Sequence, residues 1–585
     1  MTDFCQKWNH QHRLASWWQA HKGLILASAM TVYHGRQMLV TGGNDNDVAV
    51  WDISHCAPED DMRLRTSNEQ LHDSLAKFIG YRTVSSNPQY AEDCRRGATF
   101  LRTLFRRFGA VTEMFNTEGH LNPVVFAEFK GNHQSTRRRK RILFYGHYDV
   151  IAAENECGKW AADPFTMQPT NGYVYGRGAS DNKGPVLAAL YAAAELLSQQ
   201  QLYADILFVV EGEEECGSRG FEKAIKENKG IIGQIDYILL ANSYWLDDDV
   251  PCLTYGLRGV IHATITVESD QPDLHSGVDG SSLLDESLKD LVMILAKLNG
   301  PHGEVRLPAF YDPILQVTEA ERERYADITR TLLRRNPALG DTDTLTASLM
   351  QRWREASLTI HRFKVSGPEN STIIPRRAQA AISMRLVPNQ ETSVVKRGLI
   401  DFLTSAFEEL GSKNRLTIRI DREAEPWLGD PENAIFRVLE EAIIAVWGPT
   451  VNAAPSSSSS PRQGPLKESS RSTTFSSQSQ PPSPATSSTL SGTCDHNTAI
   501  PSIPPLSSLS TTTTQLSKPF RPLYIREGGS IPSIRFLEKE FSAPAAHLPC
   551  GQASDSAHLD NERLRLVNLY NSREIFKRVF GIGGL

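Results

Sequence analysis

Residues 141–150 read Arg-Ile-Leu-Phe-Tyr-Gly-His-Tyr-Asp-Val, an apolar run that passes into a glycine and polar side chains. The continuous apolar stretch from Ile142 to Tyr145 is typical of a strand buried on both faces of a parallel sheet. In an extended chain His147 and Asp149 point to the same side. Asp149 could then hold one ring N–H of His147 while the other ring nitrogen binds a metal. A strand that ends in a polar loop with a solvated histidine is the alternative at this point.

The composition is that of an ordinary globular protein. Hydrophobic residues make up 40% and charged residues 22% of the 585 residues, and the formal net charge of −6 gives no argument for nucleic-acid or membrane binding. No apolar run approaches the ~20 residues that cross a bilayer, and the first residues do not resemble a signal peptide. The eight cysteines are scattered and form no Cys-x-x-Cys pair. We therefore expect a cytoplasmic protein with reduced thiols.

Further strands downstream also end in residues of the kind that bind metals. A glycine-rich turn spans residues 176–184, and apolar strands are predicted over 206–210 and 237–240. The polar residues in the turn and after the strands are Asp181, Glu214, Glu215 and Asn242. Open α/β sheets place their ligand sites at the carboxyl ends of strands, and clustered carboxylates repel one another unless cations compensate them. An exposed acidic loop is the other reading of Glu214 and Glu215.

The assembled pattern resembles a known family of enzymes. Gly-His-Tyr-Asp at 146–149, Gly-Arg-Gly-x-Ser-Asp-Asn-Lys-Gly at 176–184 and Glu-Gly-x-Glu-Glu-x-Gly-Ser at 211–218 are similar to the motifs of the di-zinc metallopeptidases of family M20, the carnosinase, carboxypeptidase and aminoacylase group. The resemblance covers nearly all of residues 65–585. It implies an α/β fold, in which a catalytic domain with a mostly parallel sheet carries an inserted α+β lid domain through which the family usually forms homodimers.

The resemblance also implies roles for individual residues at the metal site. His147 and Glu215 would each bind one of two zinc ions, Asp181 would bridge the ions, and His558 would be a terminal ligand. Glu214 would be the general base, and Asp149 would support the histidine ligand as part of the catalytic machinery.

Three further residues are candidates for substrate binding, two of them because they match positions of the family. His275, in Asp-Leu-His-Ser-Gly, corresponds to a histidine that reaches into the partner subunit's active site, although a surface histidine without that role is the alternative. Arg385 corresponds to an arginine that binds the substrate carboxylate. Ser530 lies in a glycine turn, residues 526–532, whose backbone N–H groups could hold an anionic group.

The chain divides into several predicted segments. The N-terminal segment has short strands, a Gly-Gly-Asn-Asp turn and a Trp51-Asp52 ending, as in one blade of a WD40 propeller. An irregular stretch is expected between Leu298 and a helix that begins at Leu345. The Ser/Thr/Pro-rich insert is expected to be disordered. The predicted divisions are 1–53 for the partial blade, 54–64 for a linker, 65–256 and 428–585 for the catalytic domain, 257–427 for the lid, and 455–517 for the insert.

Asn242 departs from the family pattern, because active relatives carry an aspartate there. An amide brings no charge, so Asn242 is expected to be a weak ligand and the second metal to bind less tightly. With the WD40-like segment and the insert, this departure suggests a fungal subgroup that, with a glutamine-amidotransferase-like partner, splits the γ-glutamyl bond of glutathione. The alternatives are a stand-alone dipeptidase for Cys-Gly or carnosine-like substrates, and a non-catalytic scaffold for the amidotransferase.

Overall fold

The computed structural model describes residues 4–8, 14–19, 25–33, 36–45, 47–52, 66–132, 138–153, 159–279, 284–452 and 521–581. The predicted linker 54–64 and the Ser/Thr/Pro-rich insert 455–517 lie outside these residues. Among the helices that are described, none is both long and apolar enough to span a bilayer.

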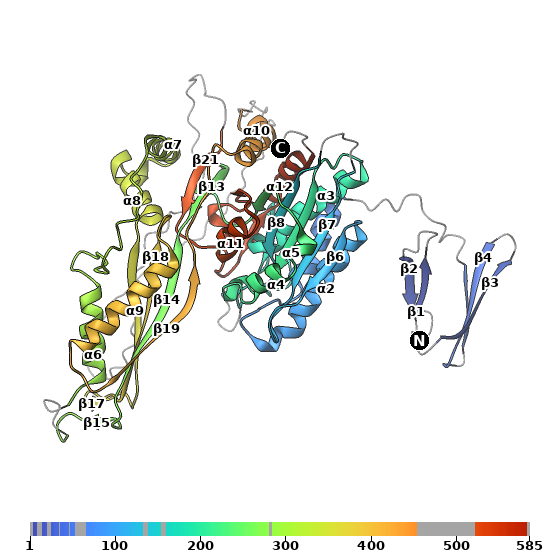
Figure 1. Ribbon diagram of the computed structural model, residues 1–585. Helices are drawn as coiled ribbons and strands as arrows, with labels where there is room; N and C mark the ends of the chain where they lie inside the picture. The colour runs from blue at the N-terminus through green and yellow to red at the C-terminus, as the bar shows by residue number, and fades with distance from the viewer. Residues whose placement is uncertain are drawn as a thin grey trace, which may run out of the picture.

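A nine-stranded sheet forms the centre of the catalytic domain (Figure 1). The strand β8 (Arg141–His147) lies between β11 (Asp205–Glu211) and β12 (Tyr237–Leu240) and runs parallel to both. On the far side of β12, β22 (Ala545–His547) is also parallel. The remaining strands are β6 (Val111–Phe115), β7 (Val124–Phe129), β13 (Cys252–Leu257), β20 (Trp427–Leu428) and β21 (Leu523–Glu527). Because the middle of the sheet is parallel, the predicted fold class is confirmed.

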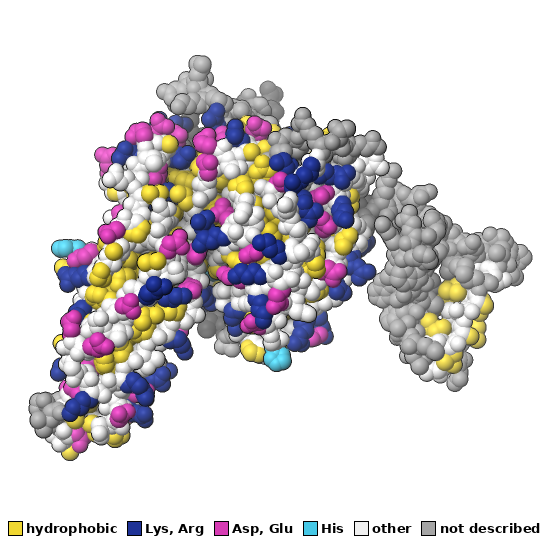
Figure 2. All heavy atoms as spheres, viewed as in Figure 1, with side chains coloured by type: hydrophobic (Ala, Val, Ile, Leu, Met, Phe, Trp, Pro, Cys, Tyr) yellow, Lys and Arg dark blue, Asp and Glu magenta, His cyan; other side chains and the backbone are white. Residues whose placement is uncertain are grey.

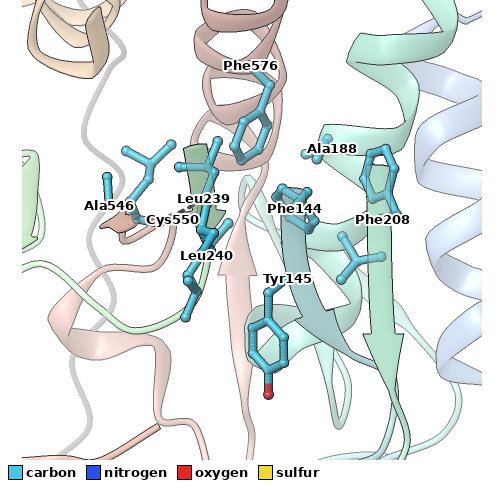
Figure 3. Packing of buried hydrophobic residues seen from close by; sticks show 14 of the residues in the cluster. Phe144, Tyr145, Ala188, Phe208, Leu239, Leu240, Ala546, Cys550 and Phe576 are labelled. Carbon is cyan, nitrogen blue, oxygen red and sulfur yellow. Dashed lines mark hydrogen bonds between the residues drawn. The ribbon is translucent and has the colours of Figure 1, made fainter. Parts of the chain in front are cut away.

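The strand β8 is buried on both faces, which explains its continuous apolar sequence. Its residues from Ile142 onward are buried, and the Phe144 ring packs 5.1 Å from Phe208 and 5.7 Å from Phe576 between ring centroids (Figure 3). Burying such a side chain contributes roughly 1.5–3 kcal/mol. The alanine-rich helix α3 (Gly184–Ser198) packs closely in the same core, as does α12 (Leu566–Gly581). The sheet is therefore a rigid platform for the polar residues at its carboxyl edge.

Other helices complete this domain. Ser67 caps α1 by accepting a hydrogen bond from the Gln70 N–H at 3.3 Å. These helices are α1 (Asn68–Ile79), α2 (Ala91–Arg107), α4 (Phe221–Glu227), α5 (Lys229–Ile232), α10 (Ala434–Asn452) and α11 (Pro532–Phe541). On the face shown in Figure 2, basic and acidic side chains are interspersed, as the small net charge suggests.

The lid has a sheet and a hydrophobic core of its own. Its four antiparallel strands lie in the order β16-β18-β14-β19, and α6 (Ser287–Leu298) and α9 (Thr392–Glu408) cover one face. The strands are β14 (Gly259–Glu268), β16 (Ser357–Val365), β18 (Arg377–Leu386) and β19 (Arg415–Ala424). A small pair of strands, β15 (Leu274–His275) and β17 (Ile373–Ile374), lies at the tip of this arm (Figure 1).

Two helices within the range 257–427 pack on the catalytic domain instead of the lid. Tyr325 and Trp353, from α7 (Glu319–Arg335) and α8 (Thr342–Arg354), belong to the same hydrophobic cluster as the central sheet. The predicted irregular stretch between 298 and 345 is wrong, because α7 lies within it. The apolar periodicity that would predict α7 is interrupted, because the charged residue Glu321 takes one of the buried positions. Glu321 is tolerated there because it pairs with Arg354 and Arg526.

The N-terminal segment contains strands, as expected. The hairpin predicted around Gly42 and Gly43 is confirmed, because β4 (Arg36–Gly43) pairs antiparallel with β5 (Val48–Asp52), and β3 (Ile25–Tyr33) pairs with β4. A separate pair is formed by β1 (Phe4–Trp8) and β2 (Leu14–Gln19). Antiparallel pairing of this kind occurs in many β structures, so the WD40 blade stays a prediction.

Candidate metal centre and active site

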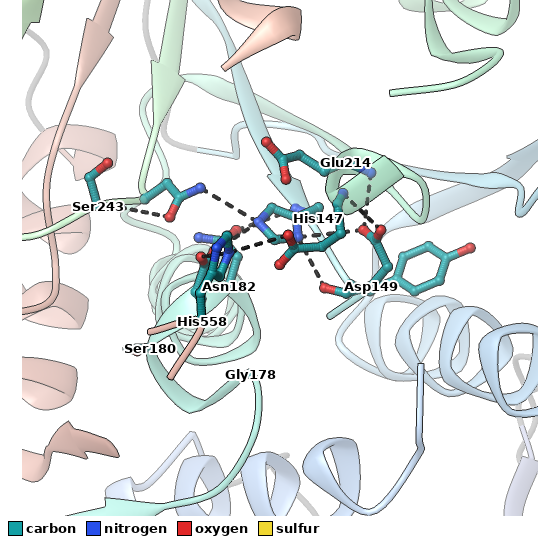
Figure 4. Close-up of polar contacts among 12 residues, drawn as sticks. His147, Asp149, Gly178, Ser180, Asn182, Glu214, Ser243 and His558 are labelled. Atoms are coloured by element: carbon teal, nitrogen blue, oxygen red, sulfur yellow. Dashed lines mark hydrogen bonds and ion pairs between the residues drawn. The ribbon is translucent and has the colours of Figure 1, made fainter. Parts of the chain in front are cut away.

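His147 is the last residue of β8, and its ring is held on several sides. Its main-chain N–H donates to Asn182 Oδ1 at 3.3 Å, while the Asn182 side-chain nitrogen donates to the Ala241 carbonyl. The ring atom Nδ1 lies 3.1 Å from the main-chain oxygen of Asp149 and 3.5 Å from its Oδ1. These contacts direct Nε2 toward Asp181, whose Oδ1 lies 3.0 Å away (Figure 4). Asp149 thus holds the His147 ring as expected, but the hydrogen bond goes to its main-chain oxygen, and the carboxylate lies beside the ring at 3.5 Å.

Asp181 lies between two histidines. Its Oδ2 is 3.2 Å from Nε2 of His558, which in turn is 3.2 Å from Oε2 of Glu215. The ligand atoms of His147, Asp181 and Glu215 all lie within 4.8 Å of one another. The hydrogen bonds that the His558 ring makes to the Asp181 and Glu215 carboxylates raise its pKa to about 10. Imidazole and carboxylate groups are common zinc ligands, so this cluster of side chains has the chemistry of a metal site.

A buried glutamate holds the loop that carries Asp181. Glu562 is fully buried, and its Oε2 accepts hydrogen bonds from Arg177 Nη1 and the Gly178 N–H, both at 2.8 Å. Its Oε1 accepts from the Ser180 N–H and hydroxyl and from the Asp181 N–H, at 2.9–3.1 Å. Gly178 has φ 87°, a left-handed conformation that favours glycine. Glu562 thereby fixes the loop and, with it, the Asp181 carboxylate.

Asp149 is fully buried and links β8 to the turn after β11. Its carboxylate accepts hydrogen bonds from the Ser85 hydroxyl at 2.7 Å, the Glu214 N–H at 3.2 Å and the Glu215 N–H at 3.0 Å. The same carboxylate also lies beside the His147 ring. Asp149 therefore sets the relative positions of one histidine ligand and two glutamates.

The Glu214 carboxylate has no hydrogen bond or ion pair within the described part of the chain. In Figure 4 its side chain lies next to His147 and makes no dashed contact through its carboxylate. Burial raises the pKa of Glu214 well above its ordinary range; the charge of His147 opposes this shift, and the charges of Glu215, Asp181 and Asp149 reinforce it. Cations would relieve this repulsion between carboxylates. The residues present thus fit a metal centre with an adjacent free carboxylate.

Asn242 is oriented unfavourably for a metal ligand. The Ser243 N–H donates to Asn242 Oδ1 at 2.6 Å, so the amide nitrogen faces Nε2 of His147 at 3.5 Å. Nε2 of His547 lies 2.7 Å from the Asn242 carbonyl oxygen and holds the main chain there. To present its amide oxygen to a cation, Asn242 would have to rotate and lose the bond from Ser243. The position therefore contributes neither a charge nor, in this rotamer, an oxygen ligand.

The predicted substrate-binding residues are not gathered at one point. His275 is exposed on β15 at the tip of the lid, away from the metal cluster of its own chain (Figure 1). Arg385 is half-buried at the end of β18, and Ser530 is half-buried in the loop after β21. Sequence reasoning did not single out the positioning residues Ser85, Asn182 and Glu562. Asn182 and Glu562 lie close in sequence to the predicted ligands Asp181 and His558, which was the only signal for them. Ser85 meets Asp149 only in the fold, so no signal for it was present in the sequence.

Comparisons with known proteins identify the family. Residues 143–461, more than half of the chain, match the family model described as "Peptidase family M20/M25/M40". The chain belongs to this family. The M20 resemblance of the motifs is thereby confirmed, as is the prediction of a metallopeptidase-type hydrolase.

Individual relatives agree with this membership. The "Probable di- and tripeptidase DUG2" of Saccharomyces cerevisiae is 36% identical over 96% of this chain, which spans 59% of that protein's length. The "Cys-Gly metallodipeptidase dug1" of Schizosaccharomyces pombe is 29% identical over 86% of this chain and 93% of that protein. The solved structure of the dipeptidase Dug1p from Saccharomyces cerevisiae matches 88% of this chain and 95% of its own, with a TM-score of 0.65 and 25% identity.

Replacement of Glu562 by Gln tests whether it positions the metal ligands of this M20 chain. The variant removes the charge opposite Arg177 and weakens the hydrogen bonds to the Asp181 loop. We expect metal affinity to fall about 10–100-fold, as for other supporting residues of metal sites. Competition with a chelator measures the affinity, and Tm measured alongside shows whether the fold survives. Glu574→Gln, on the exposed side of α12, is the matched control. Unchanged metal affinity in Glu562→Gln would contradict the positioning role.

Proposed function

We propose that this chain is a zinc-dependent peptidase that hydrolyses amide bonds of small peptides. The observation that carries the proposal is the Asp181 carboxylate, which lies at 3.0 Å and 3.2 Å between the ring nitrogens of two histidines. One zinc ion would be held by His147 and Asp181, and the other by Asp181, Glu215 and His558. The His147 side would bind zinc more weakly, because Asn242 adds no charge there.

The chemistry follows from the groups around this centre. When bound, two zinc ions polarise the scissile carbonyl group and lower the pKa of the attacking water. Glu214, whose carboxylate is free of protein partners in the described structure, takes the proton from that water and passes it to the leaving amine. Asp149 keeps the His147 ring oriented and, through the Glu214 N–H, holds the turn on which the base lies.

Glu214→Gln separates proton transfer from metal binding. The amide has the size of the carboxylate but cannot take up a proton, so turnover should fall by roughly 10²–10⁴-fold. Metal content and Tm should stay close to those of the wild type, because the Glu214 side chain has no protein partner. Steady-state hydrolysis by the complete protein, together with its glutamine-amidotransferase-like partner, is the measurement. Full activity of Glu214→Gln would show that a partner performs the chemistry and would favour the scaffold alternative.

We further propose that the substrates are di- and tripeptides of the glutathione and Cys-Gly class. The names of the yeast relatives support di- and tripeptides, with Cys-Gly among them. Asn242 favours dependence on a glutamine-amidotransferase-like partner, and with it glutathione as substrate, over a stand-alone dipeptidase. A homodimer formed through the lid would allow His275, which lies far from its own metal cluster, to serve the partner subunit. We also propose a cytoplasmic location, with which the free thiols of Cys94, Cys216, Cys252 and Cys550 agree.

Asn242→Asp tests the dependence on a partner. The added carboxylate should compensate the repulsion between two dications and strengthen binding of the second metal ion. We expect higher stand-alone hydrolysis of Cys-Gly by the variant, whereas the wild type needs the amidotransferase-like partner to act on glutathione. The two proteins are assayed on both substrates with and without the partner. If the wild type alone cleaves Cys-Gly as fast as Asn242→Asp, the chain is a stand-alone dipeptidase.

A further inference from the structure

One face of the lid sheet carries a row of basic side chains. In the strand register, Val260 of β14 lies opposite Arg385 of β18, and His262 lies opposite Arg422 of β19. Residues two apart on a strand share a face, so Arg385, His262 and Arg422 project from the same side. The intervening Ile261 is buried in the lid core under the helices. The basic row therefore occupies the face that the lid helices leave uncovered.

This face meets the loops of the catalytic site. Arg422 donates from Nη2 to the Glu215 carbonyl at 3.3 Å, and a Cβ atom at Gly217 would come within 3.1 Å of the Arg422 side chain. At the other end of the row, Arg258 donates from Nε to the Gly528 carbonyl at 3.3 Å. The basic residues thus lie above the turn that carries Glu214 and beside the turn that carries Ser530.

The positive charge of the row is largely uncompensated. Arg385 has no hydrogen bond or ion pair to any other residue that the structure describes, and the single hydrogen bond of Arg422 goes to a neutral carbonyl. Both acidic neighbours of Arg422 on β19 have other partners: Asp421 accepts from Arg419 and from the Thr264 hydroxyl, each at 2.6 Å, and Glu423 pairs with Lys396 at 2.8 Å. Burial, together with the charges of Arg385 and Arg422, lowers the pKa of His262 between them. Two guanidinium groups are thus available to bind anions.

The spacing of the two arginines fits a particular size of ligand. Arg385 and Arg422 lie on the two strands that flank β14, and they are opposite residues two apart on β14. Two inter-strand spacings of about 10 Å in all, with an offset of about 7 Å along the strands, place their Cα atoms about 12 Å apart. An extended tripeptide spans about 10 Å, whereas a dipeptide spans about 7 Å. A γ-glutamyl tripeptide carries a carboxylate at each end, but an ordinary dipeptide carries only one.

We propose that Arg385 and Arg422 form a two-point clamp that selects peptides with two terminal carboxylates. The inference rests on the proposed peptidase function and adds the residue that determines the preferred substrate. Arg385 binds one carboxylate, and Arg422 binds the second and so favours a γ-glutamyl tripeptide over a dipeptide. Arginine suits this role because its guanidinium pairs with a carboxylate through two parallel hydrogen bonds.

The competing role for Arg422 is a purely structural one. The bond to the Glu215 carbonyl and the contact with Gly217 could simply hold the lid against the catalytic domain. Loss of such a lid contact would weaken the binding of every substrate equally. The clamp instead requires a loss that is confined to ligands with a second carboxylate, so comparison of two ligands separates the roles.

The test uses the full chain loaded with zinc and two non-thiol probes, S-methylglutathione with two carboxylates and S-methyl-Cys-Gly with one. Calorimetry measures Kd for the wild type, Arg422→Gln, Arg422→Lys and the control Arg419→Gln on the same strand. We expect Arg422→Gln to weaken S-methylglutathione binding by about tenfold or more and the dipeptide by less than about twofold. Arg422→Lys should restore part of the affinity, and Arg419→Gln should resemble the wild type.

The outcomes distinguish the clamp from the proposed function. Equal weakening of both probes, or no preference of the wild type for the tripeptide, would overturn the clamp while leaving the peptidase proposal intact. Selective loss of tripeptide binding in a chain that hydrolyses no peptide would support the clamp and reject the peptidase proposal.

Discussion

The arrangement of the whole site depends on the position of one carboxylate, that of Asp181. It faces His147 on one side and His558 on the other, and these residues come from parts of the chain that are hundreds of positions apart. The loop of Asp181 is fixed by Glu562, whose buried charge is balanced by Arg177 and by backbone N–H groups. A buried charge is tolerated when it is paired and fully hydrogen-bonded. The free-energy cost of burying Glu562 is therefore offset by its ion pair with Arg177 and its hydrogen bonds. The same contacts fix the loop that carries the metal ligand Asp181.

The catalytic domain and the lid carry opposite charges where they face each other. Asp149, Glu214 and Glu215 follow parallel strands of the central sheet and Asp181 lies in the adjacent loop, and the mutual repulsion of these carboxylates calls for cations. The lid above carries arginines without acidic partners nearby. In the proposed clamp, the terminal carboxylates of a peptide would meet the arginines while its amide bonds face the metal centre. Asn242 lowers the negative charge beside His147 by one, compared with the aspartate that the family pattern has at this position.

The sequence predicted those features in which local pattern and tertiary environment agree. The run Ile142 to Tyr145 could be recognised as a buried central strand because both of its faces are covered, and the motifs around it place His147 and Asp181 at one sheet edge. The helix α7 was missed because Glu321 faces the interior and its pairing with two arginines is invisible in a periodicity analysis. The rotamer of Asn242 was equally inaccessible, since it is decided by the N–H of Ser243. The supporting role of Glu562 depends on contacts with a loop almost four hundred residues earlier.

The most direct test of this account is anomalous X-ray diffraction at the zinc edge from crystals of the zinc-loaded protein. We expect two peaks about 3.5–4 Å apart, the spacing of two-metal hydrolytic sites, both within reach of the Asp181 carboxylate. The peak beside Glu215 and His558 should be the stronger, and the peak beside His147 the weaker. Zinc bound elsewhere, or a single ion that does not touch Asp181, would contradict the account.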